Sequence, residues 1–219
     1  MTEPLDMNLD ELKAALAPRL GVHAGFDGWG EAALAMAAGE LGVPADRARL
    51  AFPGGAAEMV DAWFVSVDKA MLDAFPPDRI AAMKIRDRIK NLLLFRLETL
   101  APWREALRRA LAVLALPRNA PKAAGLAWRS ADRIWRLAGD TAADFNHYSK
   151  RAILIGVYGS TTLIFLDDES EGLADTRAFL DRRIAEVMRF EKAKARWKGS
   201  AGPHFSLSRL LGRLRYPAI

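Results

Sequence analysis

The chain has 219 residues, of which 51% are hydrophobic, enough for one or two domains with a proper core. It contains no cysteine, which excludes disulfide bonds and thiolate metal sites and favours a reducing compartment. Its formal charge of +5 is uneven, because residues 1–75 carry five cations against twelve acids and residues 192–219 carry seven cations and no acid. The basic end favours contact with an anionic surface or an acidic partner.

The first twelve residues, MTEPLDMNLDEL, are acidic and contain neither an apolar run nor an arginine. A secretory signal needs an apolar core and a mitochondrial transit peptide is rich in arginine, so we expect neither. No apolar segment reaches the roughly twenty residues that a transmembrane helix needs. These features predict a cytoplasmic protein.

Alternating β-branched runs are scarce and alanine, leucine and arginine dominate, so the sequence predicts an all-α fold. Leu9, Leu12, Leu16 and Leu20 mark a first amphipathic helix, and a short third helix is expected near Pro44. The other expected helices span residues 30–41, 56–74, 78–100, 103–116, 122–138, 142–166 and 173–195. The sequence GSAGP at 199–203 predicts a linker before a detached final helix.

The segment AILIGVYGSTTLIFL between Arg151 and Asp167 is apolar or small on every side, which predicts a helix buried all round. The acidic run Asp167 to Glu169 that follows is interpreted as a helix stop and loop. Small residues on a shared face would let another backbone approach closely, and that face carries Ile155, Gly156, Gly159 and Leu163. Two interpretations stay open: a central core helix, or a dimer seam that is also one wall of an apolar cavity.

The first three helices, with LGV in the turn, have the spacing of a helix-turn-helix, and the following FPGGAAEMVDAWF resembles the segment after the recognition helix in TetR-type repressors. Nucleic-acid binding needs cations to neutralise phosphates, but this head carries a net charge of −7. Its candidate recognition helix offers only Arg47 and Arg49, offset by Asp46, and no amide or hydroxyl side chain to read base edges. We therefore expect a head without nucleic-acid binding; the alternative is a ligand-responsive TetR-type transcription regulator.

Signals of catalysis are weak. The three histidines, His23, His147 and His204, are far apart and none has metal-ligand spacing. His147 with Asp140 and Asp144 resembles a general base with orienting carboxylates, but Arg151 on the same face makes a solvated charged stripe the simpler interpretation. We expect no catalytic residue, no metal and no enzymatic activity.

The final helix is amphipathic. At 100° per residue its four leucines fall within an arc of about 100°, with the arginines outside it. Such a helix lies in a bilayer interface, although its leucines could instead dock on the parent body. The candidate membrane residues are Phe205, Leu207, Arg209, Leu210, Leu211, Arg213 and Leu214.

Two further stretches, WRSADRIWRLAGDTAADFNHYSKRAIL and VYGSTTLIFLDDESEGLADTRAFLDRRIAEVMRFEKAK, resemble the TetR-like lipid-binding accessory proteins of ubiquinone biosynthesis, whose pattern includes DFNWYTKR and DTW. The match spans roughly residues 100–195, and residues 8–75 correspond to the family's degenerate helix-turn-helix. The resemblance implies a homodimer that binds an isoprenoid lipid or quinone in a hydrophobic cavity, without another cofactor. It also implies membrane contact through the final helix and presentation of quinone precursors to the hydroxylase that acts on demethoxyubiquinone.

The resemblance also implies where these activities lie. The head would span residues 1–75, the lipid-binding and dimerisation body 76–198, and the linker with its membrane helix 199–219, on the inner face of the plasma membrane. The family's partner-binding patch maps to Asp140, Asp144, Asn146, His147, Tyr148 and Arg151. His147 replaces the family's tryptophan, which would weaken or retune hydroxylase docking, and Arg177 replaces the tryptophan of DTW.

Cavity-lining candidates are taken from the aromatic and aliphatic residues of the central helices. These residues are more numerous than one packed pair of core helices needs, which favours a cavity. We also expect the helices 142–166 and 173–195 to pair across a two-fold axis. The lipid-binding candidates are Leu93, Leu94, Leu97, Trp135, Leu154, Tyr158, Thr161, Leu163, Phe165 and Phe179.

Overall fold

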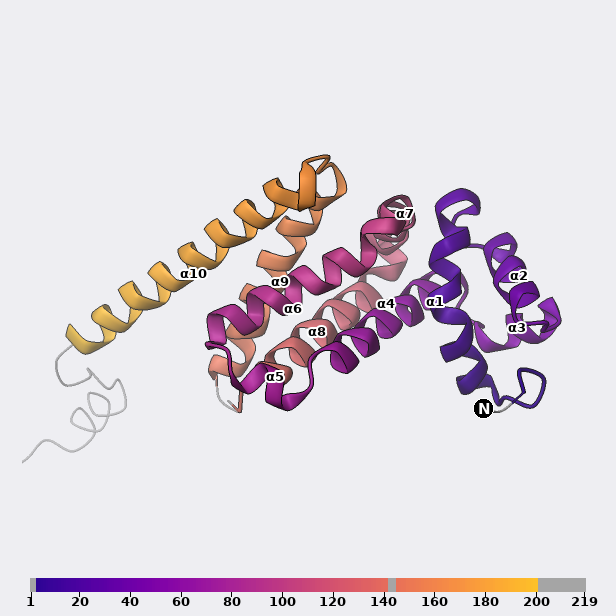
Figure 1. Ribbon diagram of the computed structural model, residues 1–219, viewed down its shortest axis with the longest axis horizontal. Coiled ribbons are helices and arrows are strands. Elements are labelled where there is room, and N and C mark those ends of the chain that lie inside the picture. Colours follow the sequence, from indigo (N-terminus) through magenta and orange to yellow (C-terminus); the bar gives the residue numbers. More distant parts are fainter. Residues whose placement is uncertain (1–2, 142–144, 201–219) are drawn as a thin grey trace, which may run out of the picture. The chain divides into compact units, whose positions relative to one another are not determined.

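The computed structural model describes residues 3–141 and 145–200, with side-chain detail for 3–141 and 147–190 (Figure 1). The described chain contains helices and no strand, which confirms the all-α prediction. Its elements are α1 (Leu9–Asp27), α2 (Glu31–Glu40), α3 (Ala45–Ala51), α4 (Gly55–Ala74), α5 (Pro77–Ala81), α6 (Ile85–Leu100), α7 (Arg104–Ala115), α8 (Ala120–Leu137), α9 (Phe145–Leu166) and α10 (Ala174–Ser200). Three short 3-10 turns join them at Ala101–Trp103, Pro117–Asn119 and Glu171–Leu173.

Two predicted boundaries are wrong. The helix expected at 78–100 is divided into α5 and α6. The Arg88 guanidinium stabilises the break by donating to the carbonyls of Ala81, the last residue of α5, and of Met83 between the two helices. The helix expected to end at 195 continues to Ser200, because lysine, alanine and arginine are good helix formers and one glycine does not stop them. Residues 142–144 and 201–219, including the predicted membrane helix, lie outside the described residues.

The chain divides into two compact units, residues 1–181 and 182–219, and the contacts described below all lie within the first. Helix α1 packs against α2, α3, α4 and α7, while α4, α6 and α8 lie side by side and α9 packs on α6, α7 and α8 (Figure 1). One hydrophobic cluster includes buried residues of the head as well as of the body. The three-helix head is therefore part of the same core as the helices that follow it.

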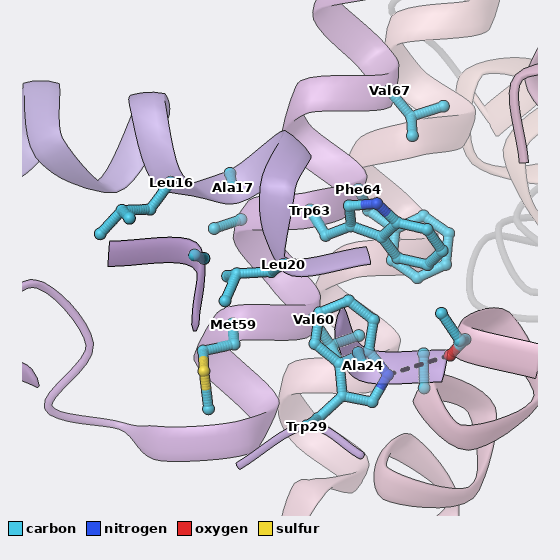
Figure 2. Packing of buried hydrophobic residues seen from close by; sticks show 14 of the residues in the cluster. Leu16, Ala17, Leu20, Ala24, Trp29, Met59, Val60, Trp63, Phe64 and Val67 are labelled. Carbon is cyan, nitrogen blue, oxygen red and sulfur yellow. Dashed lines mark hydrogen bonds between the residues drawn. The ribbon is translucent and has the colours of Figure 1, made fainter. Parts of the chain in front are cut away.

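Two tryptophans join the head to the body. The Trp29 and Trp63 ring centroids are 5.0 Å apart, and Trp63 also packs on Phe64 (Figure 2). The Trp29 indole N–H donates to the buried carbonyl of Ala106 on α7 at 2.9 Å (Figure 2). This bond satisfies a polar group that would otherwise be costly to bury.

The acidic run after α9 is a helix stop, as predicted, and its Asp168 ties α9 to α10. The Asp168 carboxylate is 4% exposed and accepts from the Ser170 and Thr176 amides, at 2.9 and 2.8 Å, and from both hydroxyls. Burial raises the pKa of Asp168, but the hydrogen bonds from Ser170 and Thr176 outweigh it and hold that pKa well below its ordinary value of 3.8.

Gly21→Ala is expected to destabilise the fold by about 1–3 kcal/mol, because a Cβ at Gly21 would lie 2.7 Å from Trp63 Cε2 in a fully packed region. The control is Gly25→Ala on the same helix, where the nearest atom is 3.8 Å away. That change is expected to stabilise the protein by about 0.5–1 kcal/mol because alanine is the better helix former. Denaturant unfolding of both variants measures the difference, and equal effects would contradict the predicted close packing.

Asp168→Asn is expected to cost about 1–3 kcal/mol near neutral pH, because an amide NH₂ cannot accept the hydrogen bonds that hold α9 to α10. Since the folded pKa of Asp168 is lowered, its stabilisation is complete above the unfolded pKa of about 3.9 and is lost as the pH falls further. The difference in unfolding free energy between wild type and variant should therefore shrink below about pH 4. The exposed neighbour Asp167, changed to Asn, serves as control; an Asp168→Asn effect independent of pH would contradict the assignment.

Candidate functional site

The strongest candidate site is a cavity of about 460 Å³ in the body, between α4, α6, α7, α8 and α9. This volume lies in the range of small-molecule binding sites. Most of its wall is apolar, with Leu107, Leu111 and Leu114 from α7 and Leu126 and Ile134 from α8. The cavity opens to the surface beside Leu163, and its apolar wall can hold an apolar chain or ring largely out of water.

Three of the ten predicted lipid-binding residues line this cavity: Leu154, Tyr158 and Leu163, all on α9. The other seven do not line it: Leu93, Leu94, Leu97, Trp135, Thr161, Phe165 and Phe179. Leu93 and Leu97 are fully buried core residues, and the Thr161 hydroxyl donates to the Val157 carbonyl within its own helix. Core and cavity linings have the same chemistry, so composition does not separate them.

Sequence reasoning missed the α7 and α8 walls. The available signal was their amphipathic spacing, for example Leu107, Leu111 and Leu114 at positions i, i+4 and i+7 of α7. It also missed a buried charge. Arg96 occupies the core-facing register of α6, four residues before Leu100, and this register was the available signal. A charged residue in an apolar register indicates a buried partner.

That partner is Asp68 on α4, and both side chains are fully buried. Arg96 lines the cavity and donates through Nη1 to Asp68, through Nη2 to Ser130 at 3.3 Å and through Nε to the Tyr158 hydroxyl at 3.2 Å. The other Asp68 oxygen accepts from Arg133 at 2.7 Å. Burial and the neighbouring Arg129 lower the pKa of Arg133. The cavity thus has one polar wall, in which the buried charges are paired.

A second candidate surface lies at the start of α9. The Tyr148 ring is stacked 5.8 Å from Trp128 of α8, and the His147 ring lies 5.1 Å from Tyr148. Tyr148 is 60% exposed, so this aromatic group presents a large ring at the surface. Of the other predicted partner-binding residues, Asp144 and the Asn146 side chain lie outside the described part.

The predicted solvated stripe is wrong for Asp140 and Arg151. Arg151 is 1% exposed, donating to Asp132 at 2.7 Å, to Asp140 at 3.2 Å and to the His147 carbonyl at 2.9 Å. The Asp140 side chain is also buried and accepts from Lys150 at 2.6 Å. The opposite charges compensate one another out of water, so these residues hold α8 and α9 in register beneath the aromatic group.

Helix α9 is not buried all round, contrary to the sequence prediction. Its Ala152, Gly156, Gly159 and Leu163 are exposed, and Leu163 reaches 62%. A Cβ at Gly156 or Gly159 would meet no atom within 4 Å. Tertiary packing covers only one side of the helix, and the uncovered side is the predicted small-residue face.

The two cations of the candidate recognition helix contact other groups of the head, Arg49 through ion pairs at its surface. Arg47 on α3 donates to the Met7 carbonyl at 2.5 Å, while Arg49 pairs with Asp46 at 2.5 Å and Glu31 at 3.2 Å. A phosphate would have to displace these contacts.

Within the described residues no helix is long and apolar enough to cross a membrane, and no group of three His, Asp or Glu side chains is placed to hold a metal. All seven predicted membrane residues fall beyond the described part.

Comparison with known proteins places these features in a family context. Residues 120–191 match the family model described as COQ9. The mitochondrial ubiquinone biosynthesis protein COQ9 of Rattus norvegicus is 40% identical over 104 residues, covering 48% of this chain and 32% of the relative. COQ9 of Xenopus tropicalis is 30% identical over 168 residues, covering 74% of this chain and 53% of the relative. The chain thus spans about a third to a half of the length of these curated relatives.

Among solved structures, a TetR transcriptional regulator from Nitrosomonas europaea has a TM-score of 0.64 and 25% identity, covering 80% of this chain and 97% of that one. The COQ9 relatives are named as mitochondrial proteins, which does not support the plasma-membrane location expected from the sequence. The family match falls on α8, α9 and the following turn and helix, which carry much of the cavity and the aromatic group. The expected resemblance is therefore confirmed: this chain is similar to the COQ9 proteins, and its fold is similar to that of a TetR regulator.

Proposed function

We propose that this chain is a non-catalytic lipid-binding protein of ubiquinone biosynthesis. It takes up an isoprenoid lipid or quinone precursor at a membrane and presents it to the hydroxylase that acts on demethoxyubiquinone. The observation that carries the proposal is the apolar cavity of about 460 Å³, whose α8 and α9 walls lie in the segment similar to COQ9. The relatives' names supply the pathway.

The cavity suits part of a long isoprenoid rather than all of it. Its lining on α8 runs from Ala123 to Ile134, about 16 Å along the helix at 1.5 Å per residue. A site of this size shelters a ring and the first isoprene units, while the remaining tail stays in the bilayer. Such an arrangement would bring the reactive ring out of the membrane without extracting the whole lipid.

The uncovered side of α9 supports a homodimer. Gly156 and Gly159 leave room for a second backbone, and exposed Leu163 adds apolar area beside them. Ile155, Gly159 and Leu163 also line the cavity, so a partner copy seated on this face would cover the cavity wall as well. Paired helices with small residues at the contact are a low-cost symmetric interface.

The aromatic group of Trp128, His147 and Tyr148 is the proposed docking surface for the hydroxylase. Exposed aromatic rings are favoured interface anchors. His147 stands where the family has tryptophan, but the Trp128 ring lies 6.2 Å from it and supplies an indole to the same surface. The buried Asp140–Arg151 pair would act beneath this surface by fixing its shape.

Transcription regulation is the weaker candidate, supported by the likeness to a TetR regulator. The acidic head and the contacts of Arg47 and Arg49 with other groups of the head both oppose phosphate binding. Because the head contributes to the common core, its retention has a structural reason that is independent of DNA.

Organic extracts of the purified protein are expected to contain an isoprenoid lipid or quinone by mass spectrometry. Gly159→Phe is expected to lower the amount of lipid per protein severalfold, because a ring at Gly159 occupies space in the cavity wall. The matched control is Gly156→Phe, one turn earlier on the same exposed face but outside the cavity lining. Protein without isoprenoid lipid, or equal retention by both variants, would contradict lipid storage in this cavity.

Liposome flotation tests the membrane contact. A chain ending at Gly199 is expected to lose most of its binding to anionic vesicles, because it lacks the leucines and arginines predicted for the interfacial helix. In the full-length protein, Leu207→Glu with Leu211→Glu should have the same effect without truncation. Unchanged flotation of both proteins would reject the terminal helix as the membrane anchor.

A further inference from the structure

We propose that Ser130 and Tyr158, held in place by Arg96 and Asp68, form a polar subsite in the cavity that binds a hydrogen-bond-accepting oxygen. On the proposed function, on which this inference rests, that oxygen is a ring carbonyl of a prenylated quinone. The ring would lie against α6, α8 and α9, and the tail along the leucines of α7 and α8.

The Arg96 guanidinium is held in place by its buried partners. It is completely buried, lies 5.3 Å from the centre of the Tyr158 ring, and uses each of its three nitrogens in a hydrogen bond. Asp68 compensates its charge and is itself oriented by Arg133. Arg96 therefore orients the Ser130 and Tyr158 hydroxyls and determines how they are used.

The direction of these hydrogen bonds is set by chemistry. A guanidinium only donates, so the Ser130 and Tyr158 oxygens must accept from Arg96, and each hydroxyl keeps its own proton. Among the hydrogen bonds of the described residues, neither hydroxyl acts as a donor. The neighbouring hydroxyls differ, because Thr161 and Thr162 on α9 donate to the backbone carbonyls of Val157 and Tyr158. Two unused O–H donors thus belong to residues that line one apolar cavity.

These donors define the ligand chemistry. A buried donor without an acceptor is destabilising, and a carbonyl oxygen between the two hydroxyls would offset that penalty. A pure hydrocarbon offers no acceptor. Asp68 already compensates the charge of Arg96, so the subsite offers a carboxylate or phosphate no free cationic partner. The subsite therefore fits a neutral oxygen acceptor attached to an apolar tail.

Equilibrium binding of two probes to the full-length protein tests the subsite: a benzoquinone with a two-isoprene tail, and squalene as the hydrocarbon. Tyr158→Phe and Ser130→Ala are each expected to weaken quinone binding about tenfold and to leave squalene binding unchanged. Thr161→Val is the matched control, because Thr161 lies on the same helix as Tyr158, does not line the cavity, and already uses its hydroxyl proton. This control should bind both probes like the wild type.

Wild-type quinone binding by Tyr158→Phe and Ser130→Ala would overturn the subsite alone. A parallel loss of quinone and squalene would also overturn it, since both residues would then only support the cavity shape. A wild-type protein that binds neither probe would instead reject the proposed function. A carboxylate with the same tail that binds more tightly than the quinone would overturn the neutral-acceptor assignment.

Infrared difference spectroscopy provides a test that does not depend on the variants folding. Hydrogen bonding weakens a carbonyl bond, so the C=O band of the quinone bound to wild-type protein should shift to lower frequency than in hexane. The Thr161→Val protein should give the same shift. A band at the hexane frequency would overturn the assignment of a hydrogen-bonded carbonyl.

Discussion

The buried ion pair between Asp68 and Arg96 is the interaction on which the body of this protein depends. Neither charge reaches water, so each is tolerable only while the other and its hydrogen-bonding neighbours stay in place. The pair joins α4 to α6, and the contacts with Ser130, Arg133 and Tyr158 extend it to α8 and α9. Four of the helices that wall the cavity thus meet at one electrostatic centre, which fixes their spacing without filling the space between them.

The hydrophobic residues of the chain have two separate uses. In and near the head they pack solidly, with Trp63 against Trp29 and Gly21 leaving room for the indole. In the body, leucines of α7 and α8 face a cavity instead. Because the Trp29 indole N–H is hydrogen-bonded to the Ala106 carbonyl on α7, removing the head would expose this part of the body. A three-helix head with a net negative charge therefore has a structural role through its packing alone.

Helix α9 connects the proposed activities. One side packs on the body, one edge lines the cavity through Leu154 and Tyr158, and the outer side presents Gly156 and Gly159. Its first turn carries the aromatic surface above the buried Arg151. Ligand binding, pairing with a second copy and docking of the hydroxylase would therefore be coupled through a single rigid element.

The sequence by itself determined the helical class, most helix boundaries and the resemblance to COQ9 proteins, because glycine and proline breaks, amphipathic spacing and motifs such as DFNHY are local along the chain. Only the tertiary structure decided which leucines line the cavity, since Leu97 in the core and Leu126 in the cavity wall are chemically identical. It also decided that Arg151 is buried rather than solvated, and that Arg96 faces a partner 28 positions away. Burial and ion pairing depend on distances between helices, which no local pattern records.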